Sequence, residues 1–291
     1  MSLHWHILGA GNLGTLAAFY LRQAGFSMCL AGRPEALRRL TFPDGHSHDL
    51  LLPGDDGAPI RYLILATKAA QSLPALAPLR TRLGTGTTLV RLQNGLGSLD
   101  DLPPPHPHII DAVANSGAWR EPLPGGGEHI HLAAENTTLL GDGHSQPPSW
   151  FVALADHWPQ LSWRPDIRLQ QWLKLSLNAV INPLTALYDC DNGALLADSR
   201  LQPRFGALAE EIDALARRLL PEWPGETAAR ARALAQATAG NTSSMRADVR
   251  AGRATEIHYI NGYLLRQAEQ IGMALPEHQR IVAEILALHR P

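Results

Sequence analysis

Three polar side chains recur at four-residue intervals in an otherwise apolar stretch. The segment KLSLNAVINP carries Lys174, Asn178 and Asn182 among Leu, Ala, Val and Ile residues. At 100° per residue the three side chains fall within an arc of about 80° on a helix, so we expect one narrow polar stripe on a mostly buried helix. Buried amides need hydrogen-bond partners, which a bound polar ligand supplies. The alternative is a lysine that reaches solvent beside locally bonded asparagines.

Such a lysine is suited to proton donation. Partial desolvation lowers the pKa of an ammonium group toward neutral pH, where a general acid works best. A cationic donor beside an oxygen that gains negative charge during a reaction stabilises that charge without a metal. Pro183 lacks an N–H and crowds the carbonyl four residues earlier, so we expect the helix to kink or stop there.

A glycine-rich turn near the N-terminus predicts a phosphate site. The motif comprises Gly9, Ala10, Gly11, Asn12, Leu13 and Gly14. It leaves an apolar strand pattern and opens a helical one, which is the context of a dinucleotide-binding turn. Gly9 permits the tight turn, Gly11 lets the backbone approach a pyrophosphate, and Gly14 allows close helix packing. The helix N-terminal amides then bind the anion.

The end of the second strand indicates which dinucleotide binds. NAD enzymes usually place Asp or Glu there, whereas this chain has Arg33 and no carboxylate before Glu35. Because arginine pairs bidentately with a phosphate, we predict NADP as the cofactor. The alternative is that Arg33 is a solvated surface arginine. Arg38 and Arg39 either share the role or face water.

The pattern of elements predicts an α/β fold with two domains. Apolar runs at 3–8, 26–31, 62–66, 87–92 and 109–114 alternate with helical patterns, the first at 13–24, which indicates a mostly parallel Rossmann-type sheet. Between Gly32 and Arg61 we expect a compact loop, and at 123–142 an antiparallel hairpin at the sheet's far edge. Helical spacing at 168–188, 201–220, 226–239, 259–271 and 276–289 predicts an all-helical second domain. The boundaries are 1–165 for the NADP-binding domain and 166–291 for the helical catalytic domain.

Composition narrows the class of partner. The 291 residues carry 25 Lys and Arg against 27 Asp and Glu, so neither nucleic acid nor an anionic membrane attracts the chain in bulk. Cys29 and Cys190 match no metal or redox spacing, and the His-X-His pairs lack a third ligand, so we predict no metal site. We expect a cytoplasmic protein acting on a small molecule, either monomer or homodimer.

Six motifs together resemble one enzyme family almost from end to end. They are GAGNLG at 9–14, ATKA at 66–69, QNGLG at 93–97, WLKLSLNAVINPLTAL at 172–187, DNGAL at 191–195 and NTSSMRADVRAGRATEIHYINGYLLR at 241–266. The chain resembles the ketopantoate reductases (2-dehydropantoate 2-reductases), which reduce ketopantoate to D-pantoate with NADPH in pantothenate and coenzyme A biosynthesis. The resemblance implies a nucleotide-binding domain, a helical domain and an active site between them.

The resemblance also implies residue roles. Lys174 is the proton donor to the keto oxygen, and Glu256 lies near that lysine and the cofactor. The implied substrate contacts are Asn94, Asn178, Asn182, Asn192, Asn241 and Ser244. The implied cofactor contacts beyond the glycine-rich turn and Arg33 are Lys68, Asn94, Glu256 and the backbone of Ala118.

Each role has an alternative. Glu256 after Thr255 could complement a helix dipole, Asn94 before Gly95 could be a turn pair, Ser243 and Ser244 could cap a helix, and Lys68 could be solvated. Two other functions fit the sequence: an NADP-dependent reductase of a different 2-oxo acid, and a protein that senses NADP without turnover.

Overall fold

The computed structural model describes residues 3–288, which form two compact units. The first contains the chain up to Gln93 and residues Ser98–Ile167. The second contains Asn94–Gly97 and the chain from Arg168 onward. The four residues of Asn94–Gly97 therefore belong with a unit whose other residues come more than 70 positions later, which a single boundary at residue 165 does not capture.

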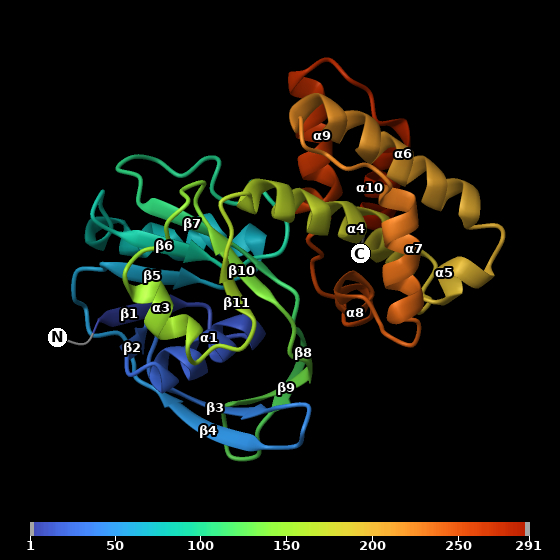
Figure 1. Cartoon of the computed structure of the whole chain (residues 1–291). Helices are drawn as coiled ribbons and strands as arrows, with labels where there is room; N and C mark the ends of the chain where they lie inside the picture. Colours follow the sequence, from blue (N-terminus) through green and yellow to red (C-terminus); the bar gives the residue numbers. More distant parts are fainter. Residues whose placement is uncertain (1–2, 289–291) are drawn as a thin grey trace. The chain divides into compact units, whose positions relative to one another are not determined.

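The larger sheet of the first unit is mostly parallel, as the sequence predicts (Figure 1). Its order is β11-β10-β7-β6-β5-β1-β2, and only the β7–β10 pair is antiparallel. The strands are β1 (His4–Leu8), β2 (Ser27–Leu30), β5 (Tyr62–Leu65), β6 (Thr88–Arg91), β7 (His108–Ala114), β10 (Thr138–Gly141) and β11 (Leu161–Trp163). Their apolar centres are buried, as parallel strands covered on both faces require. The helices of this unit are α1 (Asn12–Gln23), η1 (Ala69–Gln71), α2 (Ser72–Leu76), η2 (Ala77–Arg82) and α3 (Trp150–Ala155).

A second, four-stranded sheet corrects two predictions. Its order is β4-β3-β9-β8, from β3 (Ala36–Thr41), β4 (Ser47–Leu52), β8 (Gly117–Pro122) and β9 (Glu128–Ala134). The stretch predicted as a compact loop contains the β3–β4 hairpin. The hairpin predicted at 123–142 is wrong, because the glycine run at 125–127 turns β8 into β9, whereas β10 pairs with β7 in the larger sheet. Alternating apolar residues identify a strand but not its partner, so two strands of different sheets looked like one hairpin.

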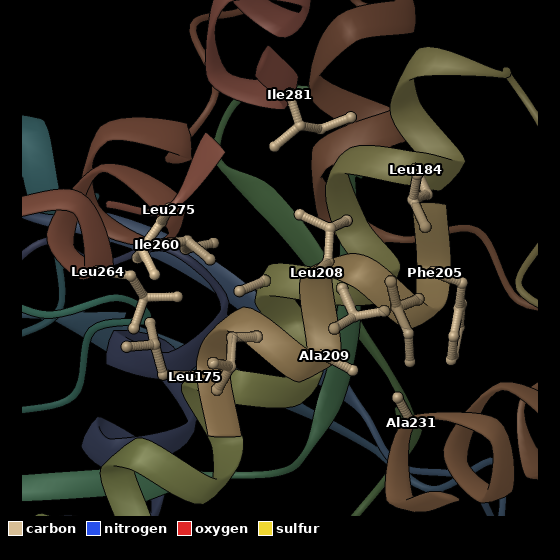
Figure 2. Packing of buried hydrophobic residues seen from close by; sticks show 14 of the residues in the cluster. Leu175, Leu184, Phe205, Leu208, Ala209, Ala231, Ile260, Leu264, Leu275 and Ile281 are labelled. Carbon is tan, nitrogen blue, oxygen red and sulfur yellow. The ribbon is translucent and has the colours of Figure 1, made fainter. Parts of the chain in front are cut away.

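The second unit is helical, as predicted: residues 168–288 contain helices and turns and no strand. Its helices are α4 (Ile167–Leu187), α5 (Ala194–Ala197), α6 (Gln202–Leu219), α7 (Thr227–Ala237), α8 (Ser244–Arg250), η3 (Ile257–Tyr259), α9 (Asn261–Gln270) and α10 (Pro276–Ala287). Apolar side chains of α4, α6, α7, α9 and α10 meet in one core (Figure 2). The predicted end of the last helix at residue 289 lies outside the described residues. No helix within residues 3–288 combines the length and apolarity that a membrane crossing requires.

The sequence predicts that α4 kinks or stops at Pro183, and the helix does not stop there. The helix continues past the proline to Leu187. Proline does remove the backbone donor for the Ala179 carbonyl. That carbonyl instead accepts a hydrogen bond from Asn261 Nδ2 at 2.8 Å, so the helix goes on because a side chain from α9 replaces the missing bond.

Candidate active site

Lys174 and Asn94 form a direct contact in the helical unit. Lys174 Nζ donates to Asn94 Oδ1 over 2.8 Å. Asn94 is placed by the residues after it: Gly95 has φ +73°, a conformation that glycine adopts freely, and Leu96 is buried in the helical core and donates its N–H to the Tyr259 carbonyl at 2.8 Å. Asn94 and Gly95 lie in a bend of the chain, and this bend presents the Asn94 amide to the lysine.

The electrostatics of Lys174 favour proton transfer near neutral pH. Burial of the ammonium group lowers its pKa to about 8, although the nearby Glu256 carboxylate acts to raise it. Glu256 precedes η3 and its side chain makes no capping hydrogen bond to that helix. A lysine that still carries its proton at pH 7 but gives it up readily is a suitable acid for a forming alkoxide.

The polar stripe of α4 has the burial that the spacing indicates. Asn182 is 8% exposed and Asn178 is half-buried, while Ala179 and Val180 between them are fully buried. Both asparagines lie on the same helix face as Lys174. The substrate roles of the two amides stay predictions.

Asn192 supplies an unused acceptor next to two further predicted residues. Its Nδ2 donates to Thr238 Oγ1 at 2.8 Å, and its backbone N–H donates to the Asn241 carbonyl at 3.2 Å. Its buried Oδ1 finds no donor among the described residues, and such an atom is costly unless a ligand or water satisfies it. Asn241 is exposed.

Two neighbouring serines at the start of α8 have different tasks. Ser243 is the N-cap: its hydroxyl accepts from the Arg246 N–H at 3.1 Å and receives a hydrogen bond from Thr185 Oγ1 at 2.7 Å. Ser244 is the first residue of the helix and is exposed. Capping by Ser243 leaves the Ser244 hydroxyl available, which is compatible with its predicted role.

The glycine-rich turn has the geometry of an anion cradle. Gly9 has φ +101°, and a Cβ there would lie 2.6 Å from the Thr67 nitrogen; a Cβ on Gly14 would overlap the Gly9 carbonyl oxygen. Gly11 is the N-cap of α1 and has no side-chain cap, while Asn12 donates its amide to the Ala118 carbonyl at 2.7 Å. The first amides of α1 are therefore not capped by a side chain, as phosphate binding requires. Ala10 and Leu13 complete the turn.

The predicted cationic contacts differ in their surroundings. Arg33 is exposed directly after β2, and Lys68 is half-buried just after β5. Arg39 pairs with Asp49 through two hydrogen bonds of 2.7 and 2.9 Å at the surface. Arg38 instead lies against the glycine-rich turn, with Nε donating to the Ala10 carbonyl at 2.9 Å. Arg38 therefore contacts the glycine-rich turn, whereas Arg39 pairs with Asp49.

Two charged residues near the cofactor turn were missed. Glu128 of β9 binds Arg38 at 3.3 Å and Arg120 of β8 at 3.0 Å, and Arg120 Nη1 lies 3.6 Å from where a Gly11 Cβ would stand. These residues are adjacent only because β3, β8 and β9 share a sheet. No local sequence signal could have found them.

A carboxylate also lies at the end of β2, where the sequence shows none. Asp55 comes from the loop after β4 and accepts from the Gly32 N–H at 2.6 Å. Arg82 binds it through two hydrogen bonds of 2.7 and 2.9 Å, and this pairing holds the pKa of Asp55 well below its usual range. Because its charge is compensated by Arg82, Asp55 does not simply replace the acidic residue of an NAD site.

The described residues of the first unit include clusters of potential metal ligands. The most buried one brings atoms of His4, His6, Cys29 and Asp56 within 4.8 Å of one another. Arg82 Nη2 lies 3.2 Å from His6 Nε2, which in turn lies 3.2 Å from Asp56 Oδ1, and a guanidinium at that nitrogen opposes a bound cation. The absence of a metal site stays a prediction. Two more exposed clusters comprise His108, Asp142 and His144, and Glu121, His129 and His131.

Comparisons with known proteins agree with the sequence motifs. The family model described as ketopantoate reductase PanE/ApbA matches residues 5–145, and its C-terminal counterpart matches 166–289. A 2-dehydropantoate 2-reductase of Salmonella typhi is 31% identical over 285 residues, covering 94% of this chain and 91% of the relative. Among solved structures, a PanE/ApbA family ketopantoate reductase of Ralstonia eutropha superposes with a TM-score of 0.85 at 20% identity, covering 99% and 98% of the two chains. D-mandelate dehydrogenase with NADH and anilino(oxo)acetate gives 0.83 at 21%, covering 99% and 98%.

The two family models together span nearly the whole chain, and the relatives match over almost all of their own length. The chain belongs to the ketopantoate reductase family of oxidoreductases.

Proposed function

We propose that this protein reduces 2-dehydropantoate to D-pantoate with NADPH, a step of pantothenate and coenzyme A biosynthesis in the cytoplasm. The observation that carries the proposal is the half-buried Lys174, whose ammonium group contacts Asn94 at 2.8 Å and whose pKa is lowered to about 8 by desolvation. That pair supplies a cationic proton donor and a polar group beside it. Relatives named 2-dehydropantoate 2-reductase at about 30% identity support the substrate.

Each group of residues has its own role in the proposed reaction. When bound at the glycine-rich turn, the nicotinamide cofactor supplies a hydride. Lys174 donates its proton to the keto oxygen and stabilises the charge that develops on it. The amides of Asn178 and Asn182 lie on the same face of α4 as the lysine and orient the substrate hydroxyl and oxygen groups, with Asn94 beside them.

The substrate carboxylate is assigned to the start of α8. Ser244 is exposed there, next to a cap made by Ser243. Asn192 brings a buried acceptor without a donor in the described part of the chain, which suits a hydroxyl donor of the substrate better than a carboxylate. The Asn241 carbonyl accepts a hydrogen bond from the Asn192 N–H, so Asn241 lies beside Asn192 and is assigned to the same substrate site. The Glu256 carboxylate raises the pKa of Lys174 and so favours its protonated form.

NADPH rather than NADH is favoured by charge. Arg33 follows β2 with no carboxylate beside it in sequence, Arg38 touches the turn at Ala10, and the one carboxylate at this strand end, Asp55, is held by Arg82. A 2′-phosphate can pair with Arg33 at this strand end, whereas Arg38 is already paired with Glu128. The NADH complexes of D-mandelate dehydrogenase make NADH the competing cofactor.

One experiment separates the candidate functions. The purified protein is assayed for cofactor oxidation with 2-dehydropantoate and with a panel of other 2-oxo acids, each with NADPH and NADH. We expect the highest kcat/KM for 2-dehydropantoate with NADPH. A higher value for another 2-oxo acid identifies a different reductase, and tight NADPH binding with no turnover of any substrate identifies an NADP-sensing protein.

A further inference from the structure

The helix that carries Lys174 contains a proline in its interior. Pro183 cannot donate to the carbonyl of Ala179, four residues earlier. Ala179 is fully buried, so water does not readily compensate for the lost bond, and an unpaired buried carbonyl is expensive. Lys174, Asn178 and Asn182 all precede Pro183, and Asn182 is its direct neighbour. Any bend at the proline therefore acts on the part of the helix that presents the polar stripe.

Asn261, the first residue of α9, makes the bond that proline removes. It is fully buried, and its Nδ2 donates to Ala179 O at 2.8 Å and lies 3.0 Å from His278 Nδ1. These two acceptors use both N–H bonds of the amide. Its Oδ1 has no donor among the described residues, so the two donations alone orient the amide.

His278 fixes Asn261 from the other side. Its Nε2 lies 3.2 Å from the Leu208 carbonyl of α6, so Nε2 carries the hydrogen and Nδ1 is free to accept from Asn261. Burial lowers the pKa of His278 to about 4, which keeps the ring neutral and this tautomer in place at neutral pH. The backbone of α10 at His278 is held in turn by Glu211, whose carboxylate accepts from the Glu277 and His278 N–H groups.

The bonds form one chain from α4 through Asn261 of α9 and His278 of α10 to Leu208 of α6. The side chains of Leu208 and of Ile260, which precedes Asn261, point into the core that these helices share (Figure 2). The chain is thus set in packed apolar surroundings, where interactions of this kind are strong.

We propose that Asn261 is a positioning residue for catalysis: by replacing the bond lost at Pro183 it holds α4 in the register that presents Lys174, Asn178 and Asn182. The inference rests on the proposed function for the role of those three side chains. Asn261 itself bonds to a backbone carbonyl and to a histidine, and acts only through the helix.

The test is a double-mutant cycle with Pro183→Ala, because an alanine at 183 brings back the backbone N–H for Ala179. Four proteins are compared: parent, Asn261→Leu, Pro183→Ala and the double variant. We expect Asn261→Leu to lower kcat at least about tenfold, with the NADPH Kd from fluorescence titration within about twofold of the parent. In the Pro183→Ala background we expect the same change to lower kcat less than about threefold.

Two further readouts distinguish positioning from general destabilisation. All rates are measured well below each variant's Tm, and the pH at which activity falls is recorded. We expect a displaced α4 to desolvate Lys174 less in Asn261→Leu, so the fall should move to higher pH, and the double variant should restore it. The proposal is refuted if Asn261→Leu lowers kcat equally in the parent and in the Pro183→Ala background. It is also refuted if Asn261→Leu makes the protein insoluble in both of these backgrounds. Insolubility of the single variant alone supports it.

The Tm of the same four proteins, measured without substrate, tests this inference separately from the proposed function. If the parent does not turn over 2-dehydropantoate, the proposed function fails while the coupling of Asn261 to Pro183 in Tm can still be present. If the parent is active and neither kcat nor Tm shows coupling, the positioning role fails alone.

Discussion

The lowered pKa of Lys174 predicts a fall in ketone reduction well below the pH at which ordinary lysines titrate. The reaction needs the protonated amine. With a pKa of about 8, about 91% of the enzyme carries the proton at pH 7 and about 9% at pH 9, so kcat/KM should drop about tenfold between them. A lysine with the usual pKa of about 10.4 would stay more than about 90% protonated over that range, and the rate would be nearly flat.

The assay is initial-rate NADPH oxidation at saturating cofactor from pH 6 to 10. Lys174→Ala should lower kcat at least about a hundredfold and abolish the break near pH 8, with the NADPH Kd close to that of the parent. Glu256→Gln removes the carboxylate that raises the lysine pKa, so the break should move to lower pH. A profile that is flat to pH 9 in an active parent, or a Lys174→Ala variant with unchanged turnover, would refute the reasoning.

Three further predictions concern other parts of the chain. Gly95→Ala should lower the free energy of unfolding by about 1–3 kcal/mol, because φ is +73° and the new Cβ would lie 2.6 Å from the Tyr259 carbonyl oxygen; Gly252→Ala, with φ +62° and open space, is the control and should cost less in denaturant titrations. Arg33→Ala should raise the NADPH KM at least about tenfold and leave the NADH KM unchanged, and a parent that prefers NADH would contradict the phosphate-pairing argument. His278 has a pKa of about 4 when folded against about 6.5 unfolded, so the unfolded state takes up the proton first and up to about 3 kcal/mol of stability is lost as pH falls from 6.5 to 4; His278→Gln should flatten that part of the stability curve relative to the parent.

The catalytic helix is the part of the site that the sequence predicts best. Lys174, Asn178 and Asn182 are positioned by a single repeat, the 3.6-residue turn, and a repeat of that kind is visible in the chain itself. Asn94 is different. It comes 80 positions before Lys174, and its place is set by the turn at Gly95 and by the burial of Leu96 in the helical core. Only the recognised motif suggested it, since no spacing rule links the two segments.

The nucleotide-binding unit shows where pattern reading ends. Strand existence follows from alternation and burial, and the predicted parallel strands are present. The pairing of strands, in contrast, depends on segments that lie far apart in the chain. Strand β9 pairs with β3 across more than 80 residues, and β10 pairs with β7 instead of β9. The same long-range pairing brings Arg120 and Glu128 beside Gly11. The charges around a cofactor turn therefore depend on sheet topology, which no single segment encodes.

Pro183 shows that a correct local rule does not by itself fix where a helix ends. Proline does remove a backbone donor and does crowd the preceding turn, and in an isolated helix this costs about 3 kcal/mol. The outcome changes because the freed carbonyl of Ala179 is buried beside a donor, Asn261, whose own position is fixed by His278. The proline and the asparagine each look unfavourable alone, one as a helix breaker and the other as a buried amide. Together they satisfy one another, so the stability of the catalytic helix is a property of the pair, and replacing Asn261 should cost less once Pro183 is alanine.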